Sequence, residues 1–288
     1  MRSRPRLLIL DFDGTMTDAE REGAPFREGY LEDLAALTER PLAWINAAAE
    51  RYEAVVAAES GSHGWVFDGR IVAPASVDPY LRMMPVARLI LDEVGAFLSP
   101  RDRDRLLDGI LYKYNYQKTR TAFREGAGAL LRGLGARSDL LTAVVTNSHT
   151  EPVQGKIKLL DEAEGGGVAW LLGRVYGRAR KYVLDDRFDA VPESLDLPGL
   201  PRPVLLRRRA YFEVLDRLRA EAGVQWAEVR VAGDIFELDL SLPISLGASV
   251  ALIANPHTPA YERAYLDAHP RGVVLERLDQ VPGWLDAT

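Results

Sequence analysis

Carboxylates that directly follow short apolar runs are the residues of this sequence whose type and spacing could do chemistry. In the stretch LLILDFDGTMTD, four apolar residues lead straight into Asp11 and Asp13. In VRVAGDIFELD, Asp234 and Asp239 follow a second apolar run. Placing carboxylates at the end of a buried strand is costly unless a charge or a hydrogen bond compensates them. The pattern therefore indicates a site that uses these groups.

A divalent cation would compensate carboxylates that meet at one edge of a sheet, where open α/β sheets bind their ligands. Mg²⁺ prefers carboxylate and carbonyl oxygens together with water, so we expect Mg²⁺ as the cofactor. A carboxylate that stays ionised beside the ion can act as a nucleophile. A second carboxylate two residues further along can transfer protons.

A phosphoryl group would fit such a site, provided that hydroxyl or amide donors and a cation balance its charge. The stretch VVTNS places Thr146, Asn147 and Ser148 at the end of another apolar run. The candidate cations are the arginines 207–209 in LLRRRAYFEVL and Lys181 in GRARKYV.

The elements that must position these residues read as buried strands, because each is a short apolar run bounded by charged residues, glycine or proline. They are Leu7–Leu10, Leu140–Val145, Val229–Ala232, Ser249–Ala254 and Gly272–Leu275. Helical patterns such as Ala210–Ala222 lie between several of them. The alternation predicts an α/β fold with a Rossmann-like, doubly wound parallel sheet.

A mostly helical block interrupts this pattern directly after the first strand, and we expect it to form a second domain over residues 19–122. The core domain would then comprise residues 1–18 and 123–288. Within the block we expect helices and one weak β-like piece, Trp65–Val72; the helices are Tyr30–Arg40, Leu42–Ala58, Pro79–Gly95 and Arg101–Thr119. Residues 161–207, with three consecutive glycines and a proline-rich stretch, predict an irregular connection.

Composition narrows the class of protein. The 288 residues carry a net charge of −6, which disfavours nucleic acid or an anionic membrane as a partner. The absence of cysteine excludes disulfides and thiol catalysis. The N-terminus has only four consecutive apolar residues before Asp11, whereas a signal peptide core needs roughly 7–15. No apolar run approaches the ~20 residues of a membrane helix. We therefore expect a cytoplasmic protein, a monomer or a homodimer.

The motifs DFDGT, VVTNS, a later cation and GDIFELD, in this order, resemble the four motifs of the haloacid dehalogenase superfamily. The resemblance implies that Asp11 attacks phosphorus and that Asp13 protonates the leaving group and then activates water. It implies Mg²⁺ on the Asp11 carboxylate, the Asp13 carbonyl and Asp234, with Asp239 orienting that shell. Thr146 would bind phosphoryl oxygens. The helical insertion matches the family's cap in the position called C1.

The third motif departs from the family, which usually has a lysine before a helix. We prefer Arg208 for this place, because it precedes a helix and arginine pairs well with phosphate. Lys181 is the rival, and Asn147 joins Thr146 as a candidate phosphate ligand. Glu237, inside the fourth motif, is expected to be a solvated helix carboxylate. In the insertion, Tyr112 and Tyr116 are expected to pack in the core.

The sequence therefore predicts a Mg²⁺-dependent phosphomonoester hydrolase that acts on a small phosphorylated metabolite through an aspartyl-phosphate. In the family that the sequence resembles, Asp13 is typical of phosphatases and phosphomutases and is absent from dehalogenases. Two alternatives stay open, a phosphomutase of the same fold and a catalytically silent binding protein that retains it.

Overall fold

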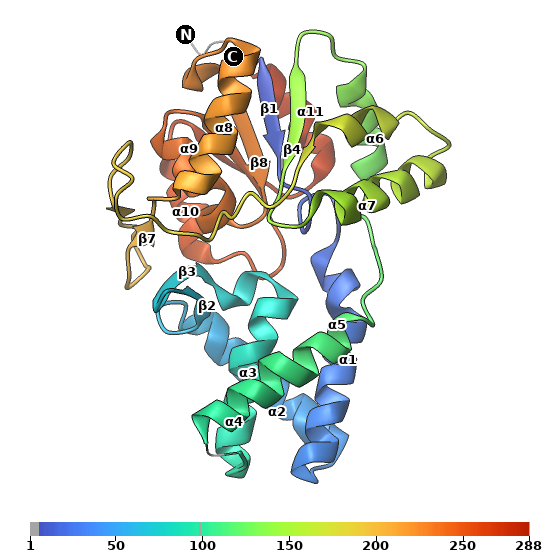
Figure 1. The fold of residues 1–288 in the computed structure, drawn as a ribbon, viewed down its shortest axis with the longest axis vertical. Coiled ribbons are helices and arrows are strands. Elements are labelled where there is room, and N and C mark those ends of the chain that lie inside the picture. Colours follow the sequence, from blue (N-terminus) through green and yellow to red (C-terminus); the bar gives the residue numbers. More distant parts are fainter. Residues whose placement is uncertain (1–5, 98, 288) are drawn as a thin grey trace. The chain divides into compact units, whose positions relative to one another are not determined.

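The computed structural model describes residues 6–97 and 99–287, and Figure 1 shows its fold. The chain divides into two compact units. One comprises Met1–Asp18 and Phe123–Thr288, and the other is Ala19–Ala122. In the described part of the chain, no helix combines the length and the apolar character that crossing a membrane requires.

The first unit is built on a six-stranded parallel sheet with the strand order β10-β9-β8-β1-β4-β5. Its strands are β1 (Leu7–Leu10), β4 (Leu141–Val145), β5 (Val175–Tyr176), β8 (Val229–Gly233), β9 (Ser249–Ile253) and β10 (Gly272–Leu275). Each apolar run that was expected to be a strand belongs to this sheet, so the predicted parallel α/β core is confirmed. The edge strand β5 was not predicted, because two residues are too short to form an apolar run.

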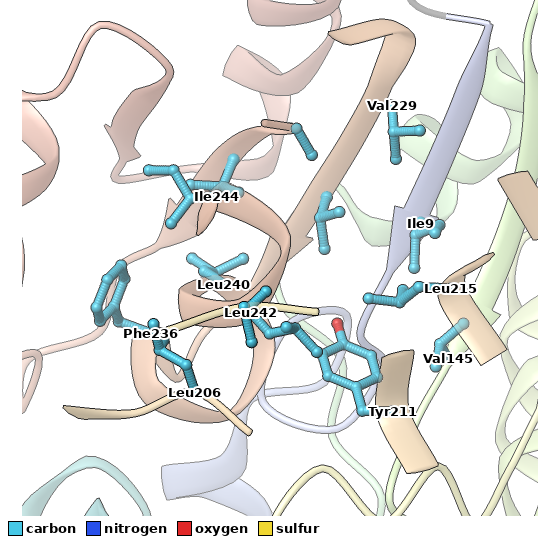
Figure 2. Packing of buried hydrophobic residues seen from close by; sticks show 14 of the residues in the cluster. Ile9, Val145, Leu206, Tyr211, Leu215, Val229, Phe236, Leu240, Leu242 and Ile244 are labelled. Carbon is cyan, nitrogen blue, oxygen red and sulfur yellow. The ribbon is translucent and has the colours of Figure 1, made fainter. Parts of the chain in front are cut away.

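Strand β1 shows why these runs are apolar throughout. Successive side chains of a strand point to opposite faces of the sheet. Leu7 and Ile9 belong to one hydrophobic cluster, and Leu8 and Leu10 belong to the other. Figure 2 shows the first cluster, in which Ile9 faces helix residues such as Leu215. Burying a side chain of this size contributes about 1.5–3 kcal/mol, so both faces anchor the central strand.

Helices cover both faces of the sheet, as Figure 1 shows. Residues of α6 (Ala127–Gly135), α7 (Thr150–Ala163) and α11 (Val281–Asp286) join the cluster of Leu8 and Leu10. Residues of α8 (Arg209–Ala222), α9 (Ser241–Ser245) and α10 (Ala260–Ala268) join the other. The segment 161–207, expected to be irregular, carries only short elements apart from the end of α7: η3 (Ala169–Arg174), β5, and the antiparallel pair β6 (Ser194–Leu195) and β7 (Val204–Leu205).

The second unit is mostly helical, as expected. Its longer elements are α1 (Ala19–Thr38), α2 (Leu42–Ala58), α3 (Pro79–Val94) and a run made of α4 (Pro100–Asp104), the π-helical η2 (Arg105–Tyr112) and α5 (Lys113–Tyr116). The weak β-like piece is a hairpin of β2 (Gly64–Phe67) and β3 (Arg70–Pro74). The 3₁₀ turn η1 (Ala75–Val77) also lies in this unit, whereas the 3₁₀ turns η4 (Trp226–Glu228) and η6 (Leu278–Gln280) and the π-helical η5 (Phe236–Leu240) belong to the first unit.

Two expectations for this unit need correction. Helix α1 begins at Ala19 rather than at Tyr30, although Gly23 and Pro25 are poor helix residues. The burial of Phe26 and Tyr30 in the unit's core outweighs that local preference. Tyr116 is half exposed rather than a core residue, although its ring stacks on Tyr112, whose ring packs against the core cluster.

The ends of helix α3 follow from its sequence. Pro79 occupies the first turn, where its missing N–H costs nothing. The Asp78 carboxylate accepts hydrogen bonds from the backbone N–H groups of Tyr80 at 2.8 Å and Leu81 at 3.0 Å. Gly95 ends the helix in the left-handed conformation, at φ 69°.

We predict that Asp78→Ala lowers the free energy of unfolding by about 1 kcal/mol, because two N–H groups lose their acceptor. Asp78→Asn, which keeps a side-chain oxygen, is the matched control and should retain most of this stability. Urea unfolding of the full chain measures both. Equal losses in the two variants would contradict this role of Asp78.

Candidate active site

The site begins where three neighbouring strands end. Leu10 of β1 pairs with Val144 of β4 on one side and with Ala232 of β8 on the other. All three strands are parallel, so the residues that follow them emerge at the same edge of the sheet. This brings Asp11 and Asp13, Thr146, and Asp234 into one region, as the sequence predicted.

Two glycines permit the close approach of these loops. Gly14 has φ 80°, and a Cβ there would lie 2.2 Å from Oδ2 of Asp234. At Gly233, a Cβ would lie 2.5 Å from the Cβ of Asp239. Any side chain at either position would push one of the acidic loops away, so both positions require glycine.

Asp11, Asp234 and Asp239 form a buried acidic cluster, in which one carboxylate oxygen of each lies within 4.8 Å of the others. The Thr15 hydroxyl lies within hydrogen-bond distance of two of them, 3.2 Å from Asp11 Oδ2 and 3.1 Å from Asp234 Oδ1. Hard carboxylate oxygens at this spacing are a donor set that fits Mg²⁺. The Asp13 carboxylate is not part of this group and points to other partners.

Lys181 balances part of the negative charge. Its Nζ donates to Asp11 Oδ1 at 2.6 Å and to Asp239 Oδ1 at 2.7 Å, and the residue is only 1% exposed. Burial alone would lower the pKa of Lys181, but the two carboxylates hold it above its usual range. Burial raises the pKa of Asp11 to about 7, against the opposing charge of Lys181.

The backbone around Lys181 is fixed by the second motif. The Lys181 N–H donates to Oδ1 of Asn147 at 2.7 Å, and the Ala179 N–H donates to the Thr146 carbonyl at 2.9 Å. Asn147 therefore orients the lysine loop, a role that the sequence did not predict. Its amide oxygen is engaged with that loop rather than directed at a phosphate.

The two candidate cations, Arg208 and Lys181, have different surroundings. Arg208 is fully buried, and its guanidinium donates to the backbone carbonyls of Leu205, at 3.0 Å, and of Lys181. Lys181 instead contacts Asp11 and Asp239 directly. Arg208, the residue directly before α8, supports the backbone of the lysine loop instead.

Asp13 has two partners in the same unit. Its Oδ1 accepts a hydrogen bond from Lys156 Nζ of α7 at 2.7 Å, and its Oδ2 lies 3.4 Å from the Thr146 hydroxyl. The Thr146 oxygen in turn accepts from the Ser148 N–H at 3.1 Å. Sequence reasoning missed Lys156, because a lysine in the middle of a helix carries no motif.

The expectation for Glu237 is wrong. The residue is fully buried and forms a bidentate ion pair with Arg202, with distances of 2.7 and 2.8 Å. Arg202 comes from the irregular segment between β6 and β7. The pair ties that segment to the loop that carries Asp234 and Asp239, and no local pattern at Glu237 signals such a distant partner.

The raised pKa of Asp11 yields a prediction about stability. Ionising Asp11 costs free energy in the folded chain but little in the unfolded chain, where its pKa is near 3.8. Stability is therefore lost as the pH rises from about 4 to about 7. Asp11→Asn should be more stable than the unmodified protein at pH 8 in EDTA, by on the order of 1 kcal/mol, because Lys181 keeps Asp239 as a partner.

Thermal unfolding at a series of pH values measures the difference in stability between Asp11→Asn and the unmodified protein. This difference should become smaller as the pH falls toward 4. Added Mg²⁺ should stabilise the unmodified protein more than the variant, because the variant offers a neutral amide oxygen in place of a negatively charged carboxylate oxygen. A variant that is less stable at pH 8 in EDTA would contradict the account of the buried charge.

Comparison of sequences gives no match to a model of a known protein family. It also gives no match among curated proteins. Comparison of structures does give matches. A predicted phosphoglycolate phosphatase from Haemophilus somnus 129PT is 14% identical, with a TM-score of 0.56 over 99% of each chain. The HAD-hydrolase YfnB from Bacillus subtilis, in a crystal structure bound to magnesium, is 14% identical, with a TM-score of 0.51 over 99% of this chain and 100% of that one.

A third similar structure is a conserved haloacid dehalogenase-like protein of unknown function from Agrobacterium tumefaciens strain C58. It is 16% identical, with a TM-score of 0.51 over 98% of this chain and 97% of that one. Identities this low carry information about the fold alone. This chain has the fold of the haloacid dehalogenase superfamily hydrolases.

Proposed function

We propose that this protein is a Mg²⁺-dependent phosphomonoester hydrolase that acts on a small phosphorylated metabolite through an aspartyl-phosphate. The observation that carries the proposal is the pairing of Lys181 with Asp11 beside Asp234 and Asp239. This arrangement holds a buried carboxylate next to both a cation and a set of oxygen ligands. Asp13, two residues from Asp11, supplies a separate group for proton transfer.

Asp11 is the proposed nucleophile. One carboxylate oxygen attacks phosphorus in line, and the bond between phosphorus and the ester oxygen breaks as the new bond forms. Asp13 donates its proton to the departing alkoxide, so that the alcohol leaves neutral. Lys181 and the Thr146 hydroxyl offset the negative charge on the phosphoryl oxygens.

Water completes the reaction. Asp13, now a carboxylate, takes a proton from a water molecule as that water attacks phosphorus. The bond between Asp11 and phosphorus breaks, and inorganic phosphate and the free Asp11 carboxylate result. Each proton that Asp13 gives to the leaving group is thereby recovered.

Mg²⁺, held by Asp11, Asp234 and the Asp13 carbonyl with Asp239 orienting that shell, would supply charge neutralisation for the phosphoryl group. The donor set supports this assignment, because one carboxylate oxygen of each of Asp11, Asp234 and Asp239 lies within 4.8 Å of the others. Thr15 orients the Asp11 and Asp234 carboxylates through its hydroxyl.

The helical unit of residues 19–122 is proposed to be the cap that selects the substrate and excludes water. Asp13 supports phosphoryl transfer over dehalogenation, because carbon–halogen cleavage leaves a halide that needs no proton.

We predict that the protein hydrolyses 4-nitrophenyl phosphate with Mg²⁺ and that EDTA abolishes the activity. Asp11→Asn should lower kcat by at least about a thousandfold, because the nucleophile is lost. Asp267→Asn, an exposed position on α10, is the matched control and should retain full activity. Release of nitrophenolate, followed by absorbance, measures all three proteins.

Three results would count against the proposal. Asp11→Asn as active as the unmodified protein would remove the proposed nucleophile. Transfer of labelled phosphate between positions of a sugar phosphate, without release, would indicate a phosphomutase. Activity no greater than the background rate in every condition would favour a binding protein that retains the fold.

A further inference from the structure

The ion pair between Lys156 and Asp13 is not explained by the motifs. We propose that Lys156 is a positioning residue for proton transfer, which anchors one oxygen of the Asp13 carboxylate so that the other stays directed at the reacting group. This inference rests on the proposed function and adds a residue to it. The lysine lies in the second turn of α7, outside the motifs of the sequence.

The two oxygens of Asp13 have different surroundings. Oδ1 accepts a charge-assisted hydrogen bond from Lys156 at 2.7 Å, within the range of strong bonds. Oδ2 lies 3.4 Å from the Thr146 hydroxyl, at the edge of hydrogen-bond distance. Because Thr146 is the proposed phosphoryl ligand, Oδ2 is the oxygen on the side of the substrate. Lys156 therefore holds Oδ1 of Asp13, whereas Oδ2 is available for proton transfer.

Helix α7 gives this anchor a rigid base. Val153, Ile157 and Leu160 are buried against the sheet, so the helix has a fixed position relative to β1 and β4. Lys156 projects from the same turns, with a side chain that is 23% exposed. The Asp13 side chain is 32% exposed, and a side chain this accessible needs a partner to keep one rotamer.

A role of Lys156 in stability alone can be distinguished from a role in proton transfer. Ion pairs that are partly exposed usually contribute only about 0–1 kcal/mol to stability, so loss of Lys156 should hardly affect folding. If Lys156 acts in proton transfer, its loss should instead lower the rate most for substrates whose leaving group must be protonated. Nitrophenolate leaves readily without protonation, whereas phenolate, a stronger base, depends more on the proton from Asp13.

The test compares 4-nitrophenyl phosphate with phenyl phosphate, which has nearly the same shape. We expect Lys156→Met to lower kcat/KM for phenyl phosphate by about ten- to a hundredfold, and for 4-nitrophenyl phosphate by less than about threefold. Lys156→Arg, which keeps the charge and the donor, should restore most of the activity toward phenyl phosphate. Lys158→Met, two residues further along on the exposed face of α7, is the matched control and should behave as the unmodified protein.

A double variant completes the test. In the background of Asp13→Asn, adding Lys156→Met should cause no further loss, because the group that it positions is already disabled. Equal losses on both substrates, or a Lys156→Met protein that behaves like Lys158→Met, would overturn this inference alone. An unmodified protein without activity on either substrate would overturn the proposed function, and this inference with it.

Discussion

The arrangement of the site depends on one buried cation, Lys181, which bridges Asp11 and Asp239. A buried lysine is stable only when nearby charges and hydrogen bonds compensate the loss of water. Asp11 directly follows β1, and Asp239 lies in η5, which follows β8, so the lysine joins the segments that follow two neighbouring strands. Removing Lys181 would take this partner from both carboxylates, whereas removing one carboxylate leaves the lysine paired with the other.

A surrounding layer of hydrogen bonds keeps this bridge in place. The Arg208 guanidinium donates to the Lys181 carbonyl, and the Tyr211 hydroxyl donates to the Asp239 carbonyl at 2.8 Å. The Tyr211 ring centroid lies 5.5 Å from Lys181 Nζ, where a cation is attracted to the face of an aromatic ring. Arg208 directly precedes α8 and Tyr211 lies in its first turn, so the start of this helix holds the lysine in place. Asn147 performs the corresponding task from the second motif.

The sequence predicted the central strands and the positions of the acidic residues, because both depend on local patterns. A strand buried on both faces, such as Leu7–Leu10, must be apolar throughout, and the residue after it must lie at the edge of the sheet. The identity of the cation could not be predicted in this way. Lys181 lies in an irregular segment, whose path is determined by contacts such as those to Thr146 and Asn147. The burial of Glu237 could not be predicted for the same reason, because its partner Arg202 lies in that irregular segment.

Glu237 and Asp13 are acidic residues in similar sequence contexts, but they have different roles. Each lies close in sequence to a proposed metal ligand, and each pairs with a distant cation. Glu237 is fully buried, and both of its carboxylate oxygens accept hydrogen bonds from Arg202, so its charge joins two segments of the chain. Asp13 is partly exposed, and only one of its oxygens is bound to Lys156. A carboxylate that must exchange protons needs such access to the reacting group, whereas a carboxylate that joins segments needs none. Exposure and the number of engaged oxygens, rather than sequence position, therefore distinguish the proposed proton carrier from the structural acid.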